Sequence, residues 1–124
     1  MKKIVATSFA VLAVFALTAL IALPAQAGEK VTKTGEVIDS ACYISKGAKG
    51  AGHKECTEKC ADAGIPLALL EDGTDEVIWL TSADHGSAND QLKPYAAQKV
   101  TITGTLSERG GAKLLVIESI EPAS

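Results

Sequence analysis

After the first 27 residues, apolar and polar side chains alternate in short runs separated by turn-forming residues. An alternation with a period of two predicts β-strands that bury one face. The pattern predicts five strands, over residues 31–38, 65–70, 76–81, 100–108 and 112–120, and the first run continues towards Tyr43. Turn sequences at 71–73 and 109–111 predict two hairpins, one from the second and third strands and one from the last two.

Other segments do not alternate. Residues 53–63 lack strand character and end at Gly64 with a proline close behind, which is typical of a helix with a glycine stop. Residues 45–52 are rich in glycine, lysine and alanine and predict a mobile loop. Pro94 is compatible with the first turn of a helix, so a short helix is expected over 93–98.

In chain order, the predicted elements are a strand, a cysteine-bearing loop and helix, two strands, a short helix and two strands. This order matches the OB-fold, a small five-stranded Greek-key barrel. A generic five-stranded barrel or sandwich is the alternative. The segments Val-Thr-Lys-Thr-Gly-Glu-Val and Val-Thr-Ile-Thr-Gly-Thr-Leu are similar to each other, and their glycines, Gly35 and Gly104, are expected to permit strong coiling of two strands.

The beginning of the chain has the features of a secretory signal peptide. Two lysines precede an uncharged, largely apolar run over 4–23, and Pro-Ala-Gln-Ala supplies a cleavage site after Ala27. The apolar run is longer than is usual, so an uncleaved anchor is the alternative. We therefore expect a signal peptide over 1–27 and a single OB-like barrel domain over 28–124, in a periplasmic or secreted protein.

Charge and length exclude several classes of function. Without the leader, the chain has 10 basic and 15 acidic side chains and a net charge of −5. This charge argues against nucleic acid and against anionic lipid, since both require a clustered positive surface. Gly47, Gly50 and Gly52 do not have a phosphate-loop spacing. No hydrolytic set of residues is evident in so short a chain, so we expect a protein that is not an enzyme.

The chemically informative residues form one cluster. All three cysteines and one of the two histidines lie within 19 positions, as Cys42, His53, Cys56 and Cys60. On a helix, positions 53, 56 and 60 share one face. Cys42 lies at the end of the first predicted strand, just before the loop that leads to this helix. Three thiols and an imidazole can therefore converge.

A metal site with these four ligands is the first interpretation. Three cysteines and one histidine form a common tetrahedral zinc sphere, and soft thiolates with an imidazole also suit Cu(I). The expected cofactor is therefore a copper or zinc ion, although C-x10-H-x2-C-x3-C is not a common zinc-finger spacing. Cys-x3-Cys with a nearby histidine resembles the copper site of Sco-type chaperones, in one short motif and not in the fold. For an exported protein, this ligand set favours a role in copper handling. Another exported protein is then the candidate partner.

A disulfide is the main alternative, because exported proteins commonly contain them. Residues four apart on a helix, such as Cys56 and Cys60, have Cβ atoms about 5–6 Å apart, whereas a disulfide requires about 3.5–4.5 Å. Cys42 would then bond with either of them and leave one thiol over. The protein would be a disulfide-stapled binding or accessory module without metal. Thiol redox chemistry is a third possibility, but the motif Cys-x-x-Cys is absent.

Three further side chains are candidates for a role. His85 lies in the polar segment 82–91 and is expected to be solvated, with a fifth-ligand or gating role as the alternative. Trp79 is expected in the core, with ligand stacking as the alternative. Tyr43 is expected to point to the face of its strand opposite Cys42 and to contribute to packing.

The whole pattern resembles a group of small exported bacterial proteins with an OB-fold-like domain. The resemblance rests on the leader, the Gly-His-x2-Cys-x3-Cys segment, Ala-Gly-Ile-Pro at 63–66 and the closing Val-Thr-Ile-Thr-Gly strand, and it spans most of the mature chain. It implies export and a compact β domain. The expected metal chemistry follows from ligand types and spacing alone.

Overall fold

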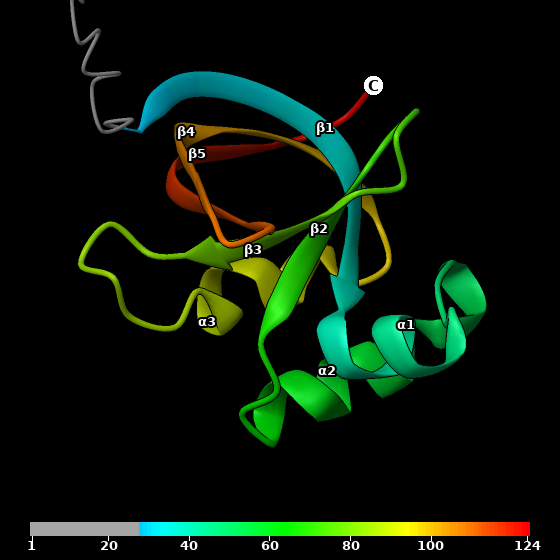
Figure 1. Cartoon of the computed structure of the whole chain (residues 1–124). Helices are drawn as coiled ribbons and strands as arrows, with labels where there is room; N and C mark the ends of the chain where they lie inside the picture. Colours follow the sequence, from blue (N-terminus) through cyan, green and yellow to red (C-terminus); the bar gives the residue numbers. More distant parts are fainter. Residues whose placement is uncertain (1–27) are drawn as a thin grey trace, which may run out of the picture.

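The computed structural model describes residues 28–124, in which five strands close into a barrel (Figure 1). The strands are β1 (Glu29–Asp39), β2 (Leu67–Glu71), β3 (Val77–Thr81), β4 (Lys99–Arg109) and β5 (Ala112–Pro122). Their order around the barrel is β1-β2-β3-β5-β4, and β4 pairs back onto β1. All neighbouring pairs are antiparallel except β3 with β5. The predicted OB-like barrel and both hairpins are confirmed, while the predicted signal peptide lies outside the described residues.

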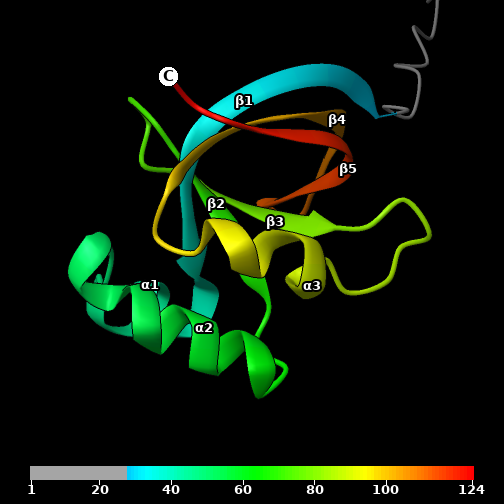
Figure 2. The same cartoon turned by 180° about the vertical axis from the view of Figure 1, so that it is seen from behind.

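Two groups of short helices connect the strands (Figure 2). Between β1 and β2 lie α1 (Ser40–Lys46), the 3-10 helix η1 (Ala51–His53) and α2 (Lys54–Asp62); between β3 and β4 lie α3 (Asn89–Leu92) and the 3-10 helix η2 (Lys93–Tyr95). The cysteine-bearing helix expected after the first strand is thus confirmed. No helix from residue 28 onwards combines the length and apolar character needed to cross a membrane.

The first strand is shorter at its end than the alternation predicted, and Cys42 lies on a helix. Asp39 ends β1 and caps α1, because its Oδ1 accepts hydrogen bonds from the backbone N–H groups of Ala41 (2.9 Å) and Cys42 (3.2 Å). Gly47, in the left-handed region with φ 69°, ends the helix. The expectation that the strand continues towards Tyr43 was therefore wrong. Tyr43 does pack, as expected, but from this helix, against a small cluster that contains Ile38.

Side chains that point into the barrel form the main buried cluster. Alternate residues of the strands contribute to it, and α3 adds Leu92, which is fully buried. Within this cluster, the strand residues with no exposed surface are Val37, Leu69, Ile78, Val100, Ile102 and Leu115. Trp79 belongs to neither buried cluster. It lies between Ile78 and Leu80, which both point inward, so its side chain is on the outer face, and the expectation of a core tryptophan was wrong.

Gly35 and Gly104 occupy places where two strands approach closely. A Cβ at Gly35 would lie 2.1 Å from the carbonyl oxygen of Leu70, and a Cβ at Gly104 would lie 2.0 Å from that of Val116. The β4–β5 register also shifts between Thr103 and Gly104, which marks a bulge. The lack of a side chain therefore lets β1 and β4 coil tightly around the barrel, as the two similar segments predicted.

The segment that carries the cysteines leaves and re-enters the barrel at one point. Asp39, the last residue of β1, is paired with Leu67, the first residue of β2. Asn89 of α3 fixes the returning chain, because its Nδ2 donates to the carbonyl oxygens of Ala61 (3.1 Å) and Ile65 (2.8 Å), and its Oδ1 accepts from the N–H of Leu67 (3.0 Å). The end of α2 is thus tied to the barrel.

Candidate metal centre

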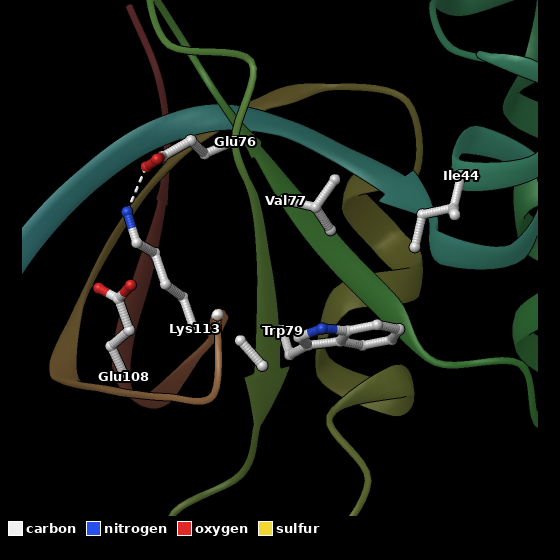
Figure 3. Close-up of a pocket in the computed structure, with 8 residues that line it drawn as sticks. Ile44, Glu76, Val77, Trp79, Glu108 and Lys113 are labelled. Atoms are coloured by element: carbon white, nitrogen blue, oxygen red, sulfur yellow. Dashed lines mark hydrogen bonds and ion pairs between the residues drawn. The ribbon is translucent and has the colours of Figure 1, made fainter.

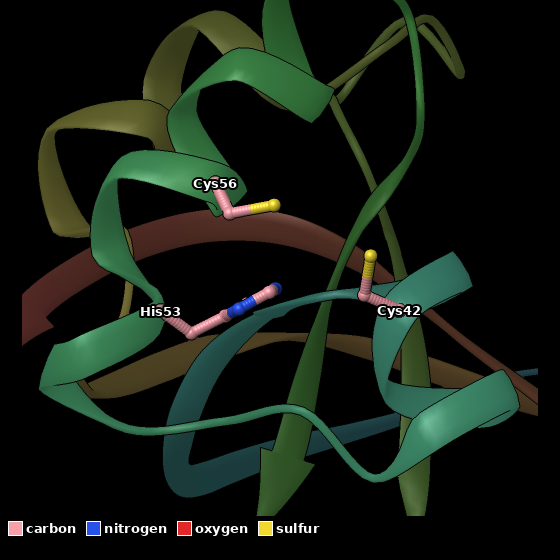
Figure 4. Close-up of side chains that lie close together, drawn as sticks. All are labelled: Cys42, His53 and Cys56. Atoms are coloured by element: carbon pink, nitrogen blue, oxygen red, sulfur yellow. The ribbon is translucent and has the colours of Figure 1, made fainter.

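Three predicted ligands converge between α1 and α2. Cys42 comes from α1, His53 is the last residue of η1, and Cys56 lies in the first turn of α2. Their ligand atoms all lie within 4.8 Å of one another. Figure 4 shows the two thiols and the imidazole directed towards a common space between the two helices. We refer to Cys42, His53 and Cys56 as the histidine group.

Hydrogen bonds of the His53 backbone fix the position of this residue, and Nε2 of its ring makes none to residues 28–124. The N–H of His53 donates to the carbonyl oxygen of Gly50 (2.9 Å), and its own carbonyl accepts from the hydroxyl of Thr57 (3.0 Å). Gly50 is in turn attached to β1, because its N–H donates to Oε2 of Glu36 (2.9 Å). The ring atom Nε2 is buried and has no hydrogen-bond partner among residues 28–124. A buried ring nitrogen without a partner is costly, and a metal ion would give it one.

A second group of ligands lies beside the first. A carboxylate oxygen of Asp39 and the thiols of Cys42 and Cys60 also lie within 4.8 Å of one another. We refer to these three residues as the aspartate group. Asp39 is fully buried, and while its Oδ1 caps α1, its Oδ2 has no hydrogen-bond partner among the described residues. Cys42 belongs to both groups.

The carboxylate and the thiols of the aspartate group shift one another's pKa values. Burial acts to raise the pKa of Asp39, but the thiols of Cys60 and Cys42 and the backbone amides of Cys42 and Ala41 together hold it below its ordinary value. In return, the Asp39 carboxylate, and after it burial, raises the pKa of Cys60 to about 12 and also raises the pKa of Cys42. Without a cation, this group therefore consists of a carboxylate beside two protonated thiols.

The four predicted ligands thus divide between two groups. The structure brings Cys42, His53 and Cys56 together, whereas it places the thiol of Cys60 with Asp39 and Cys42. No larger group within residues 28–124 meets the same 4.8 Å limit. All three cysteines are free thiols, and Cys56 is the most exposed of them. Sequence reasoning missed Asp39, although an aspartate before Ser-Ala-Cys is a recognisable helix cap.

The second histidine is elsewhere. His85 lies in the loop between β3 and α3 and has a positive φ of 62°. It borders a surface hollow of about 480 Å³, together with Trp79 and Thr81 among others. It belongs to neither group of metal ligands, so the structure gives no support to a fifth-ligand role.

Another hollow, of about 350 Å³, lies between α1, β3 and the β4–β5 turn (Figure 3). Its apolar side is formed by Ile44, Val77 and Trp79, and Ile44 is 61% exposed. On its polar side, the ammonium of Lys113 pairs with Glu76. Ile44 is on the same short helix as Cys42, so this face of the barrel adjoins the cysteine-bearing helices.

Comparisons with known proteins add no relative to this picture: no family model matches the chain, and no curated protein or solved structure matches it significantly. The geometry and chemistry of the two ligand groups are therefore the basis for a function.

Proposed function

We propose that this protein is an exported, non-enzymatic barrel that binds a copper or zinc ion through its Cys/His cluster. Cys42, His53 and Cys56 are the ligands of this ion, and Cys60 belongs to the same cluster. The described part of the chain supports metal binding because the cluster has the ligand types and the proximity that an ion needs. Export is supported by the leader-like sequence of the first 27 residues.

The observation that carries the proposal is the position of His53. Its Nε2 is buried and lacks a hydrogen-bond partner among residues 28–124, and a nitrogen of the same ring lies within 4.8 Å of two thiols. With bonds of about 2.0–2.3 Å, the ligand atoms of a tetrahedral ion are about 3.5–3.8 Å apart. Small side-chain movements would therefore bring the histidine group onto a single ion.

The donor set restricts the choice of metal. Two thiolates and one imidazole suit zinc and Cu(I), and they do not suit calcium or magnesium, which bind oxygen ligands. Three protein ligands leave a fourth position on a tetrahedral ion. A site of this kind can pass its ion to a partner that supplies the incoming ligand, which is consistent with metal handling.

The alternative is a disulfide-stapled binding module. The thiol of Cys42 lies within 4.8 Å of both Cys56 and Cys60, so either bond is within reach of a small movement. Because both bonds would use Cys42, at most one of them can form, and one thiol always remains. A disulfide at Cys42 would remove a ligand from the histidine group, so the two functions exclude each other in one molecule.

Mass spectrometry of the protein recovered from its own compartment, without added reductant, separates the two functions. The metal proposal predicts a native mass raised by zinc or copper and three reduced thiols after denaturation. A metal-free protein that is lighter by two hydrogens would overturn it and support the stapled module. His53→Ala should lower metal content, while the matched variant His85→Ala, at the histidine outside both groups, should retain it.

A further inference from the structure

The carboxylate of Asp39 has no role in the histidine group, and its position needs an explanation. It is fully buried, and its Oδ2 has no hydrogen-bond partner among residues 28–124. A helix cap needs one oxygen, which Oδ1 supplies. An asparagine or serine in this position would cap α1 as well without placing a charge in the interior. A carboxylate oxygen of Asp39 also lies within 4.8 Å of two thiols.

In this structure the two groups do not form a single ligand set. His53 and Cys56 are grouped with the Cys42 thiol, and Asp39 and Cys60 are grouped with it separately, since no larger group within residues 28–124 meets the 4.8 Å limit. Cys42 is the only residue that the two groups share. A thiolate sulfur has lone pairs for two ions at once, so a shared cysteine is compatible with two neighbouring ions.

We propose that Asp39, Cys42 and Cys60 form a second metal position, joined to the first through the bridging thiolate of Cys42. This inference rests on the proposed function, because it takes the histidine group as the first position. Each ion then has three protein ligands and one remaining place for water. The chain binds a pair of ions in this cluster.

The charge of the cluster supports the binding of two metal ions. With its thiols ionised, the cluster has four negative groups, namely the carboxylate of Asp39 and the thiolates of Cys42, Cys56 and Cys60. Two divalent cations neutralise this charge, whereas one would leave two negative charges uncompensated in a partly buried site. Each thiol releases its proton to solvent as it binds, and no electron transfer is involved.

The carboxylate also determines the class of ion. Oxygen ligands suit harder ions than thiolates do, and a mixed set of one carboxylate and two thiolates suits a borderline ion such as Zn²⁺ better than Cu(I). The second position is therefore expected to bind a divalent borderline cation, even if the histidine group also accepts Cu(I).

Stepwise addition of Zn²⁺ to the reduced full chain tests this inference, with bound ions counted by native mass spectrometry. The unaltered protein and the control His85→Ala should bind two ions. Asp39→Asn should bind one, because asparagine retains the capping oxygen but lacks the carboxylate. Cys60→Ser should also bind one. Because Cys60 lies on α2, this variant tests the second position without changing the cap of α1. Circular dichroism should show the same secondary structure in all four proteins.

Other outcomes are equally informative. If the unaltered protein and Asp39→Asn bind one ion with the same affinity, the second position does not exist, and the proposed function stands. If one ion binds and Asp39→Asn weakens it at least tenfold, Asp39 is a ligand of a single ion, which also overturns the second position. Two ions retained in both Asp39→Asn and Cys60→Ser would contradict it as well. If no ion binds, the proposed function fails too.

Discussion

Asp39 and Cys42 interact twice. The Oδ1 atom of Asp39 accepts a hydrogen bond from the backbone N–H of Cys42 at 3.2 Å, and a carboxylate oxygen of the same side chain lies within 4.8 Å of the Cys42 thiol. The residue that starts α1 therefore also fixes the position of the thiol shared by both ligand groups. One carboxylate thus caps α1 and also belongs to the aspartate group. Substitutions of Asp39 can separate these two contributions.

Removal of the cap should destabilise the metal-free protein. Asp39→Ala deletes the oxygen that accepts from Ala41 and Cys42, and loss of such a cap costs about 1 kcal/mol. Asp39→Asn preserves an acceptor and should lose less. Urea denaturation with chelator and reductant present measures the free energy of unfolding. Equal losses in the two variants would contradict the capping role.

Close approach of the strands should make Gly104 intolerant of a side chain. In Gly104→Ala the new methyl group would lie 2.0 Å from the carbonyl oxygen of Val116, so the β4–β5 pair would have to move apart. We expect a loss of at least about 2 kcal/mol in the free energy of unfolding. Gly52→Ala is the control, because no atom lies within 4 Å of its added Cβ, and it should change stability by less than about 0.5 kcal/mol.

The ion pair between Lys33 and Glu71 should make stability depend on pH in the acid range. Its Nζ–Oε1 distance is 2.6 Å, and Lys33 holds the pKa of Glu71 below its ordinary value of 4.5, against the opposing effect of burial. Since the folded carboxylate binds a proton less readily than the unfolded one, the stabilisation is complete above pH 4.5 and is lost as the pH falls through the lower folded pKa.

Lys33→Met should therefore reduce the loss of stability between about pH 5 and 3. The measurement is the free energy of unfolding at several pH values across this range. Lys30→Met is the control, because Lys30 pairs with Glu118 at an exposed position, with 69% and 44% of the two side chains accessible. Identical pH profiles for the two variants would argue against a special contribution from Glu71.

Asn89 should be important for both the barrel and the cluster. Asn89→Ala removes three hydrogen bonds and leaves the N–H of Leu67 and the carbonyl oxygens of Ala61 and Ile65 without that partner. We expect a loss of about 2–4 kcal/mol, measured by denaturation. Zinc affinity should fall as well, because Cys60 is adjacent to Ala61. Asp90→Ala, at the exposed neighbouring position, should change neither quantity appreciably.

The fold could be predicted because its signals are local. Alternation and turn residues predicted five strands, their order favoured the OB-fold over a generic five-stranded barrel or sandwich, and Gly35 and Gly104 predicted strong coiling of two strands. The prediction failed where two local signals competed. At Asp39 the alternation favours a longer strand, while Asp-Ser favours a helix cap, and the cap prevails because α1 satisfies the backbone beyond it. The prediction for Trp79 was wrong because alternation shows that neighbouring residues of a strand face opposite sides, but it does not show which side is buried.

The candidate site could be predicted only in part. Helical spacing brought His53 and Cys56 together correctly, since both lie at the start of α2. It also placed Cys60 with them, although residues 56 and 60 on a helix are about 5–6 Å apart at Cβ and Cys60 lies beside Asp39. The nearness of Asp39 to Cys60 depends on how α2 docks beside the end of β1. Sequence spacing contains no information about that tertiary relationship.

The pairing of Asp39 with Leu67 makes the cysteine-bearing segment a closed loop on an intact barrel. Its two ends stay together as long as β1 and β2 remain paired, so the entropy cost of closing the loop is already met by the barrel. We expect residues 40–60 to open and refold as a local unit while the strands stay protected from amide exchange, since Asn89 holds the chain to the barrel from Ala61 onwards. An ion that bridges α1 and α2 would stabilise the closed form of this segment. Release of the ion would free the segment without unfolding the protein.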